Sequence, residues 1–179
     1  MIVFIDAEFT DLQRPTLLSL GFVTLDGREL DVELDLATEV GLARKKASSE
    51  FVRDQVLDQW GLVPGAECSY EEMGRRTAEW LLVLAQESGT RIDVTFDYPA
   101  DFGLLELAIR DSGLWERVRG VVNPVNIGDL VASFDADLAA EAAFDELKER
   151  GLARHHALAD ALALRAAFQS VQALQGGRP

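Results

Sequence analysis

The stretch that decides the fold is IVFIDAEFT, residues 2–10. Its first four residues are all apolar, which is typical of a central strand that is covered on both faces. Asp6 and Glu8 follow, and because side chains two apart on a strand point to the same face, their carboxylates are predicted to project together. Such neighbours repel each other unless a cation lies between them, so this strand end is a candidate metal site. The alternative is a pair of solvated acids, since the chain has 31 Asp and Glu residues.

Two further strand-like runs follow, at residues 16–25 and 28–36. They are joined at Asp26-Gly27, a dipeptide preferred in two-residue hairpin turns. The chain is therefore predicted to begin with three consecutive strands whose first pairings are antiparallel.

The rest of the chain mixes helical and strand-like patterns. The segment SYEE at 69–72 is typical of a capping box at the start of a helix. Pro124 interrupts the last strand-like run and therefore favours an edge position. Helices are predicted at 49–60, 69–86, 101–110, 138–150 and 156–174, and strands at 91–96 and 118–126. This order favours an α/β fold with a mixed sheet flanked by helices.

Length and composition predict one domain, residues 1–175, followed by a frayed tail at 176–179. No run of 18 uncharged apolar residues occurs, and the acids near the N-terminus do not fit a signal peptide. The expectation is therefore a cytoplasmic protein without a membrane partner. A homodimer is left open.

Charge and cysteine content limit the partners and the metal ligands. The net charge of −14 argues against binding a long polyanion over an extended surface, but not against a small contact with the end of a strand. The single cysteine, Cys68, cannot form an internal disulfide or a thiolate cage. Carboxylates and histidines would hold any metal, and oxygen ligands favour magnesium or manganese.

Two later segments carry further candidate residues. Asp101 precedes an apolar run, where it could cap a helix or, beside a central strand, bind a metal. His155 and His156, the only histidines, stand just before Asp160 at the start of the last predicted helix. Because an imidazole titrates near neutral pH, it can take a proton from water. The alternative is a helix start with exposed imidazoles.

Together these segments resemble the DEDDh family of 3′–5′ exonucleases, which includes polymerase proofreading subunits, oligoribonuclease and ribonuclease T. In that family an Asp-x-Glu closes the first strand of a ribonuclease H-like fold, an Asp opens a middle helix, and a His-x-x-x-x-Asp lies near the C-terminus. The chain matches these motifs in order at 6–8, at Asp101 with its following leucines, and at 155–160. It departs from the middle motif, which usually has a His-Asn pair where this chain has Phe96-Asp97, so Asp97 is a rival ligand.

The resemblance implies a ribonuclease H-like fold and a two-metal mechanism. Two Mg²⁺ or Mn²⁺ ions would be held by four carboxylates, those of Asp6, Glu8, Asp101 and Asp160. His155 would be the general base, although helix geometry alone would pair His156 with Asp160.

The resemblance also implies the substrate. The enzyme would release nucleoside 5′-monophosphates from the 3′ end of single-stranded nucleic acid, with RNA favoured over DNA. Phe9 and Thr10 would contact the substrate, with Phe9 stacking on the terminal base; the alternative for Phe9 is packing in the core. The basic group at 44–46, in a predicted loop, is a weaker candidate for phosphate contacts.

Two other functions stay open. The segment DAEFT at 6–10 also resembles the Asp-x-Asp-x-Thr of haloacid dehalogenase-like phosphatases, with Asp6 as nucleophile. Glu8 departs from that motif, and a hairpin after the first strand disfavours that fold. The third hypothesis is a noncatalytic binding or scaffold domain.

Overall fold

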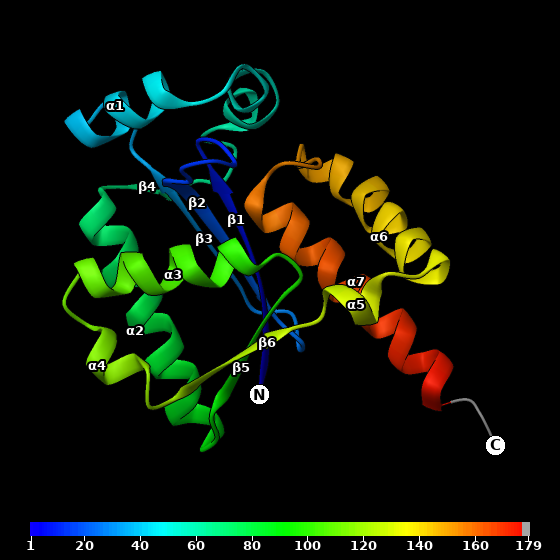
Figure 1. The fold of residues 1–179 in the computed structure, drawn as a ribbon. Helices are drawn as coiled ribbons and strands as arrows, with labels where there is room; N and C mark the ends of the chain where they lie inside the picture. The colour runs from blue at the N-terminus through cyan, green and yellow to red at the C-terminus, as the bar shows by residue number, and fades with distance from the viewer. Residues whose placement is uncertain (177–179) are drawn as a thin grey trace.

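The computed structural model of the protein describes residues 1–176. Its centre is a six-stranded sheet with the order β4-β3-β2-β1-β5-β6 (Figure 1). The strands are β1 (Ile2–Phe9), β2 (Leu17–Thr24), β3 (Glu29–Leu34), β4 (Glu67–Cys68), β5 (Ile92–Phe96) and β6 (Val122–Asn126).

The strand pairings confirm the predicted mixed sheet. β1 pairs antiparallel with β2, and β2 pairs antiparallel with β3. The pairs β1–β5, β5–β6 and β3–β4 are parallel. β1 is therefore a central strand between β2 and β5, as its uninterrupted apolar run predicts. β6, which contains Pro124, lies at an edge.

Helices cover both faces of this sheet (Figure 1). They are α1 (Glu39–Ala47), η1 (Val52–Val56), η2 (Leu57–Gln59), α2 (Tyr70–Ser88), α3 (Pro99–Asp111), α4 (Trp115–Val118), α5 (Gly128–Val131), α6 (Phe134–Leu147), η3 (Lys148–Arg150) and α7 (Ala157–Gly176). Val3 and Ile5 belong to the core under α2 and α3, whereas Phe4 belongs to the core under α6 and α7. Side chains two apart on a strand share a face, so Asp6 and Glu8 lie on the same face of β1 as Phe4, toward α7.

Several segments differ from their sequence predictions. Residues 49–60 form a π-helical turn and a 3₁₀ turn, η1 and η2, instead of one α-helix. The predicted loop at 44–46 belongs to α1, which begins after the capping residue Thr38. Arg44 donates a hydrogen bond to the Leu17 carbonyl, and its guanidinium carbon lies 3.9 Å from the centre of the Tyr70 ring. These contacts give Arg44 a structural role.

Two helix boundaries also differ from the predictions. The Ser133 side chain accepts a hydrogen bond from the Ala136 N–H and caps α6, so this helix begins at Phe134 instead of residue 138. Of the tail expected at 176–179, Gly176 is the last residue of α7, and residues 177–179 lie outside the described residues. Within residues 1–176, no helix has both the length and the apolar character needed to cross a membrane.

Gly21 allows the start of α7 to lie directly on β2. A Cβ at Gly21 would lie 2.2 Å from the Ala157 carbonyl carbon and from the Leu158 nitrogen. Both atoms are backbone, so the contact could be relieved only by moving the helix. Since Asp160 lies in the first turn of α7, this close approach fixes its height above the sheet.

Gly21→Ala is therefore expected to destabilise the fold by about 1–3 kcal/mol, the usual cost of overpacking. The matched control is Gly103→Ala, because Gly103 lies in α3 with no atom near its Cβ position. This control is expected to stabilise by about 0.5–1 kcal/mol. Urea unfolding of both variants measures the difference, and equal midpoints would contradict the packing argument.

Candidate functional site

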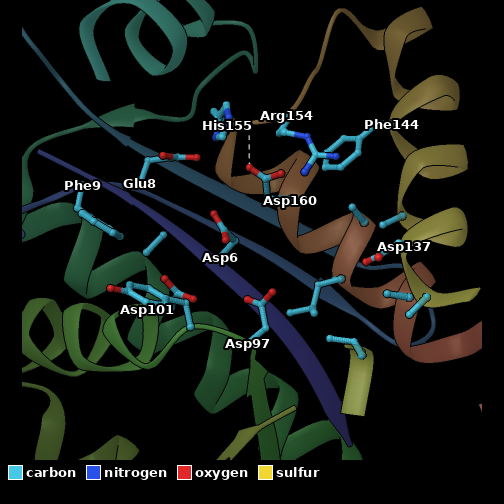
Figure 2. A pocket seen from close by; sticks show the side chains of 18 of the residues that line it. Asp6, Glu8, Phe9, Asp97, Asp101, Asp137, Phe144, Arg154, His155 and Asp160 are labelled. Atoms are coloured by element: carbon cyan, nitrogen blue, oxygen red, sulfur yellow. Dashed lines mark hydrogen bonds between the residues drawn. The ribbon is translucent and has the colours of Figure 1, made fainter. Parts of the chain in front are cut away.

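The first part of the site is the end of β1. Asp6 and Glu8 project from the same face of the strand, on the α7 side of the sheet (Figure 2). The register with β2 shifts between Glu8 and Phe9, which marks a bulge at the point where the strand leaves the sheet. On the other side, β1 pairs with β5 only as far as Phe4, so both carboxylates lie beyond the end of that pairing.

The second part comes from α3, which follows β5. Tyr98 is its N-terminal capping position and Pro99 its first residue, so Asp101 lies inside the first turn instead of capping the helix. The Asp101 side chain is 1% exposed, and its Oδ2 atom has no hydrogen-bond partner among the described residues. A buried carboxylate oxygen without a partner is unusual and is consistent with a metal ligand.

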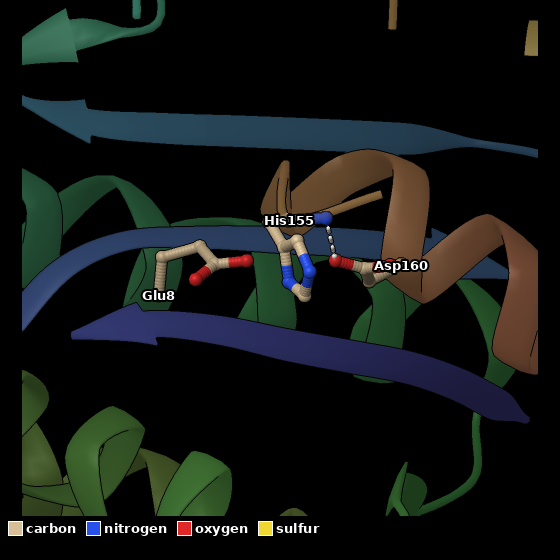
Figure 3. A group of neighbouring side chains, drawn as sticks. All are labelled: Glu8, His155 and Asp160. Carbon is tan, nitrogen blue, oxygen red and sulfur yellow. Dashed lines mark hydrogen bonds between the residues drawn. The ribbon is translucent and has the colours of Figure 1, made fainter. Parts of the chain in front are cut away.

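The third part is the entry to α7. The His155 backbone N–H donates a hydrogen bond of 2.8 Å to Oδ2 of Asp160 (Figure 3). His155 has a φ of 67°, in the left-handed region that non-glycine residues rarely adopt. This conformation turns the imidazole toward Glu8 and Asp160, so a strained backbone and a side-chain hydrogen bond together position the histidine.

These parts surround one cavity of about 520 Å³ (Figure 2). Its donor atoms form two groups. One atom each from Glu8, His155 and Asp160 lie within 4.8 Å of one another, and the same holds for Asp6, Asp97 and Asp101. The structure thus brings together all five residues predicted for metal binding and catalysis, and it adds Asp97, the rival ligand, beside Asp101.

Crowding and burial change the acidity of the cavity. Burial, followed by the neighbouring carboxylates, raises the pKa of Asp6 well above its usual range and that of Glu8 to about 8. Burial is also the main reason that the pKa of Asp101 rises to about 8 and that of Asp160 to about 7. Burial, helped by Arg154, lowers the pKa of His155, which favours a neutral imidazole able to accept a proton.

The raised carboxyl pKa values predict that the metal-free protein loses stability as the pH rises. Unfolded Asp and Glu titrate near about pH 4, so the folded state holds more protons than the unfolded state between about pH 4 and pH 8. The contribution of this proton binding to the free energy of unfolding is fully present below about pH 4 and is lost as the pH rises through the folded pKa values. Urea unfolding in chelator is expected to show a lower midpoint at about pH 8.5 than at about pH 6.

Asp6→Asn should flatten this pH dependence, because it removes one carboxyl and relieves its neighbours. Excess Mn²⁺ should reverse the sign, since the metal competes with protons for the same oxygens. A metal-free midpoint that rises with pH would contradict the assigned acidities.

The two predicted substrate residues differ in their placement. Phe9 lines the cavity, and its ring lies nearly parallel to that of Tyr98, with centroids 6.3 Å apart. Thr10 is buried and does not line the cavity, because its hydroxyl bonds the hydroxyl of Thr16 at 3.0 Å. The structure therefore gives Thr10 no direct path to a substrate.

Arg154 is a cavity residue that sequence reasoning did not single out. Among the described residues, it is the one arginine or lysine that lines the cavity. Its guanidinium pairs with Glu141 and lies 4.6 Å from the centre of the Phe144 ring. The only sequence signal for Arg154 was its position directly before His155.

A second cavity, of about 760 Å³, adjoins the first. The two share Glu8, Phe9, Leu12 and His155 as lining residues. The second is lined further by Arg14 and Phe51, and the Phe51 ring contacts His155 edge to face, with centroids 4.9 Å apart. Glu8 and His155 thus lie where the two cavities meet.

The residues fit divalent cations. The donors are carboxylate oxygens with one imidazole, a set suited to Mg²⁺ or Mn²⁺, and bound cations would let four neighbouring carboxylates ionise in one cavity. Asp6, Glu8, Asp101 and Asp160 would hold the ions, with Asp97 as a further oxygen ligand near Asp6. In comparisons with known proteins, no protein-family model matches the chain, and no curated protein matches it.

Proposed function

We propose that the protein is a metal-dependent 3′–5′ exonuclease with a ribonuclease H-like fold, of the DEDDh type. The observation that carries the proposal is the convergence of four carboxylates and one histidine, from β1, α3 and the start of α7, around one cavity. These residues match the three motifs of the family in order. The first three strands pair antiparallel in the mixed sheet. This order counts against the phosphatase alternative, because the first strand of that fold is followed by parallel strand–helix units.

When bound, two divalent cations would polarise the scissile phosphate and lower the pKa of the attacking water. His155 accepts the proton of that water at a ring nitrogen, and the lowered pKa of its imidazole keeps that nitrogen free. Glu8 lies beside His155 and shares the metal-binding role with Asp6, Asp101 and Asp160. The products are a nucleoside 5′-monophosphate and a strand shortened by one residue.

The cavities suit a short substrate contact. A volume of about 520 Å³ lies within the range of roughly 300–1,000 Å³ that is typical of small-ligand sites, so the first cavity fits one terminal nucleotide. Phe9 and Tyr98 offer aromatic faces for its base, and Arg154 offers a cation for a phosphate. The adjoining cavity, with Phe51 and Arg14, would take the next nucleotide. A contact of this size is compatible with a net charge of −14.

Digestion of single-stranded oligonucleotides tests the proposal. RNA and DNA of one sequence, each labelled at the 5′ end, are incubated with the protein and Mg²⁺ or Mn²⁺. We expect a ladder that shortens from the 3′ end, release of nucleoside 5′-monophosphates, faster loss of RNA, and no reaction in chelator. Intact oligonucleotides, together with hydrolysis of a small phosphate ester through a covalent enzyme phosphate, would instead support the phosphatase hypothesis.

A further inference from the structure

A second group of metal-binding side chains lies inside the protein, apart from the cavity. Asp31 and Glu33 are two residues apart on β3, and His156 lies just before α7. Their exposed fractions are 6%, 2% and 5%. Because Gly21 lets the start of α7 approach the sheet, His156 reaches the face of β3 on which both carboxylates project.

The polar atoms of this group lack ordinary partners. Among the described residues, neither carboxylate oxygen of Asp31 and neither ring nitrogen of His156 has a hydrogen-bond partner. Nε2 of His156 lies 3.5 Å from Oε1 of Glu33 and 3.9 Å from Oδ2 of Asp31. These distances are long for hydrogen bonds. They are typical of atoms that bind the same metal ion, because two ligand atoms about 2.1 Å from Zn²⁺ lie about 3.4 Å apart at the tetrahedral angle.

The nearby arginines act on Asp31 only at a distance, and neither forms an ion pair with Asp31 or Glu33. Arg76 donates its hydrogen bonds to the carbonyls of Gly65 and Ala66. Arg150 pairs with Glu29 at 2.7 Å. Buried carboxylates carry a large desolvation cost unless each takes up a proton or shares a cation, so a cation bound between these two would stabilise their ionised form.

The geometry points to a third cation site, formed by Asp31, Glu33 and His156, that binds one zinc ion. One imidazole nitrogen and two carboxylate oxygens form a donor set that zinc accepts, and the second oxygen of Asp31, which also lacks a hydrogen-bond partner among the described residues, can serve as a further ligand. The Gly61 N–H holds the other oxygen of Glu33 at 2.8 Å and so orients that ligand. Magnesium fits less well, because it prefers six oxygen ligands and retains several waters, whereas this buried group includes an imidazole nitrogen.

The site would join β3 to the start of α7. His156 follows His155 directly, and the small space beside Glu33 is lined by Glu8 and His155 as well. A zinc ion held here therefore fixes the segment that presents the general base, without touching the substrate. This inference stands independently of the proposed nuclease activity.

Zinc stoichiometry tests the inference in a protein whose cavity cannot bind metal. The parent is the double variant Asp6→Asn with Asp160→Asn, which is stripped with chelator, given Zn²⁺, desalted and measured by mass spectrometry of the metal. We expect about one zinc per chain in the parent, and none after Asp31→Asn is added. The matched control, Glu67→Gln, changes an exposed carboxylate on the neighbouring strand β4 and should keep the zinc.

Thermal melting supplies a second readout that separates metal loss from misfolding. In chelator, the protein with Asp31→Asn should melt at least as high as the parent, because the amide is neutral in the buried site without a proton or a cation. Added zinc should raise the melting temperature of the parent by several degrees and leave that of the Asp31→Asn protein unchanged. If Asp31→Asn does not fold, His156→Gln takes its place with the same expected loss of zinc. A parent without zinc, or equal zinc in parent and variant, would overturn the inference.

Discussion

Asp6→Ala and Asp160→Ala are each expected to lose the cavity metal and the nuclease activity together. Asp6 lies beside Asp97 and Asp101, and Asp160 lies beside Glu8 and His155, so each variant breaks one of the two donor groups. Without both cations the phosphate and the attacking water lose their activation, and turnover should fall by about 10³-fold or more. Removing one of several repelling carboxylates should leave the fold intact or make the metal-free protein more stable.

Calorimetric titration with Mn²⁺ and digestion of a labelled oligonucleotide measure the two losses in one preparation. Asp129→Ala is the control, because Asp129 is an exposed acid outside the donor groups. An Asp6→Ala protein that still degrades the oligonucleotide at the parent rate would remove Asp6 from the mechanism.

His155→Ala is expected to lose the nuclease activity and to keep the metal. Turnover should fall by about 10²- to 10⁴-fold, the usual contribution of a general base, whereas Mn²⁺ binding should stay close to that of the parent. His155 has a positive φ, so part of any effect could arise from the backbone. His155→Asn addresses this, since asparagine tolerates the left-handed region well, and it should be as inactive as His155→Ala.

His156→Ala is the informative comparison, because the neighbouring imidazole is buried against Asp31 and Glu33 instead of lining the cavity. Its turnover should fall much less than that of His155→Ala. A silent His155→Ala together with an inactive His156→Ala would transfer the base role to His156.

The central strand and the hairpin were predictable because their signals are local. The uninterrupted apolar run at 2–5 and the turn at Asp26-Gly27 each act within a few residues. The missed helix α1 shows the limit of such signals. Its buried contact is Gly41, and the rest of its surface is mostly polar, so its sequence carries no apolar stripe to distinguish it from a loop. Likewise, no local sequence pattern predicts the π-helical turn at Val52–Val56.

The candidate site was predictable in its motifs and not in its surroundings. Motif order selected Asp6, Asp101 and His155, and the structure brings them to one cavity. The location of His156 could not be predicted, because it depends on side chains of β3 that are distant in sequence. The burial of Thr10 depends in the same way on the tertiary contact with Thr16. Helix periodicity favoured His156, but the left-handed turn at His155 breaks that periodicity before α7 begins.

Anomalous diffraction from crystals grown with Mn²⁺ and a nucleoside 5′-monophosphate tests the central claim most directly. The account predicts two manganese ions about 3.5–4 Å apart, bound among Asp6, Glu8, Asp101 and Asp160. The nucleotide phosphate should contact both ions, with His155 on the side from which water attacks. A cavity that binds the nucleotide without manganese, or a single ion that does not contact Asp6, would contradict the account.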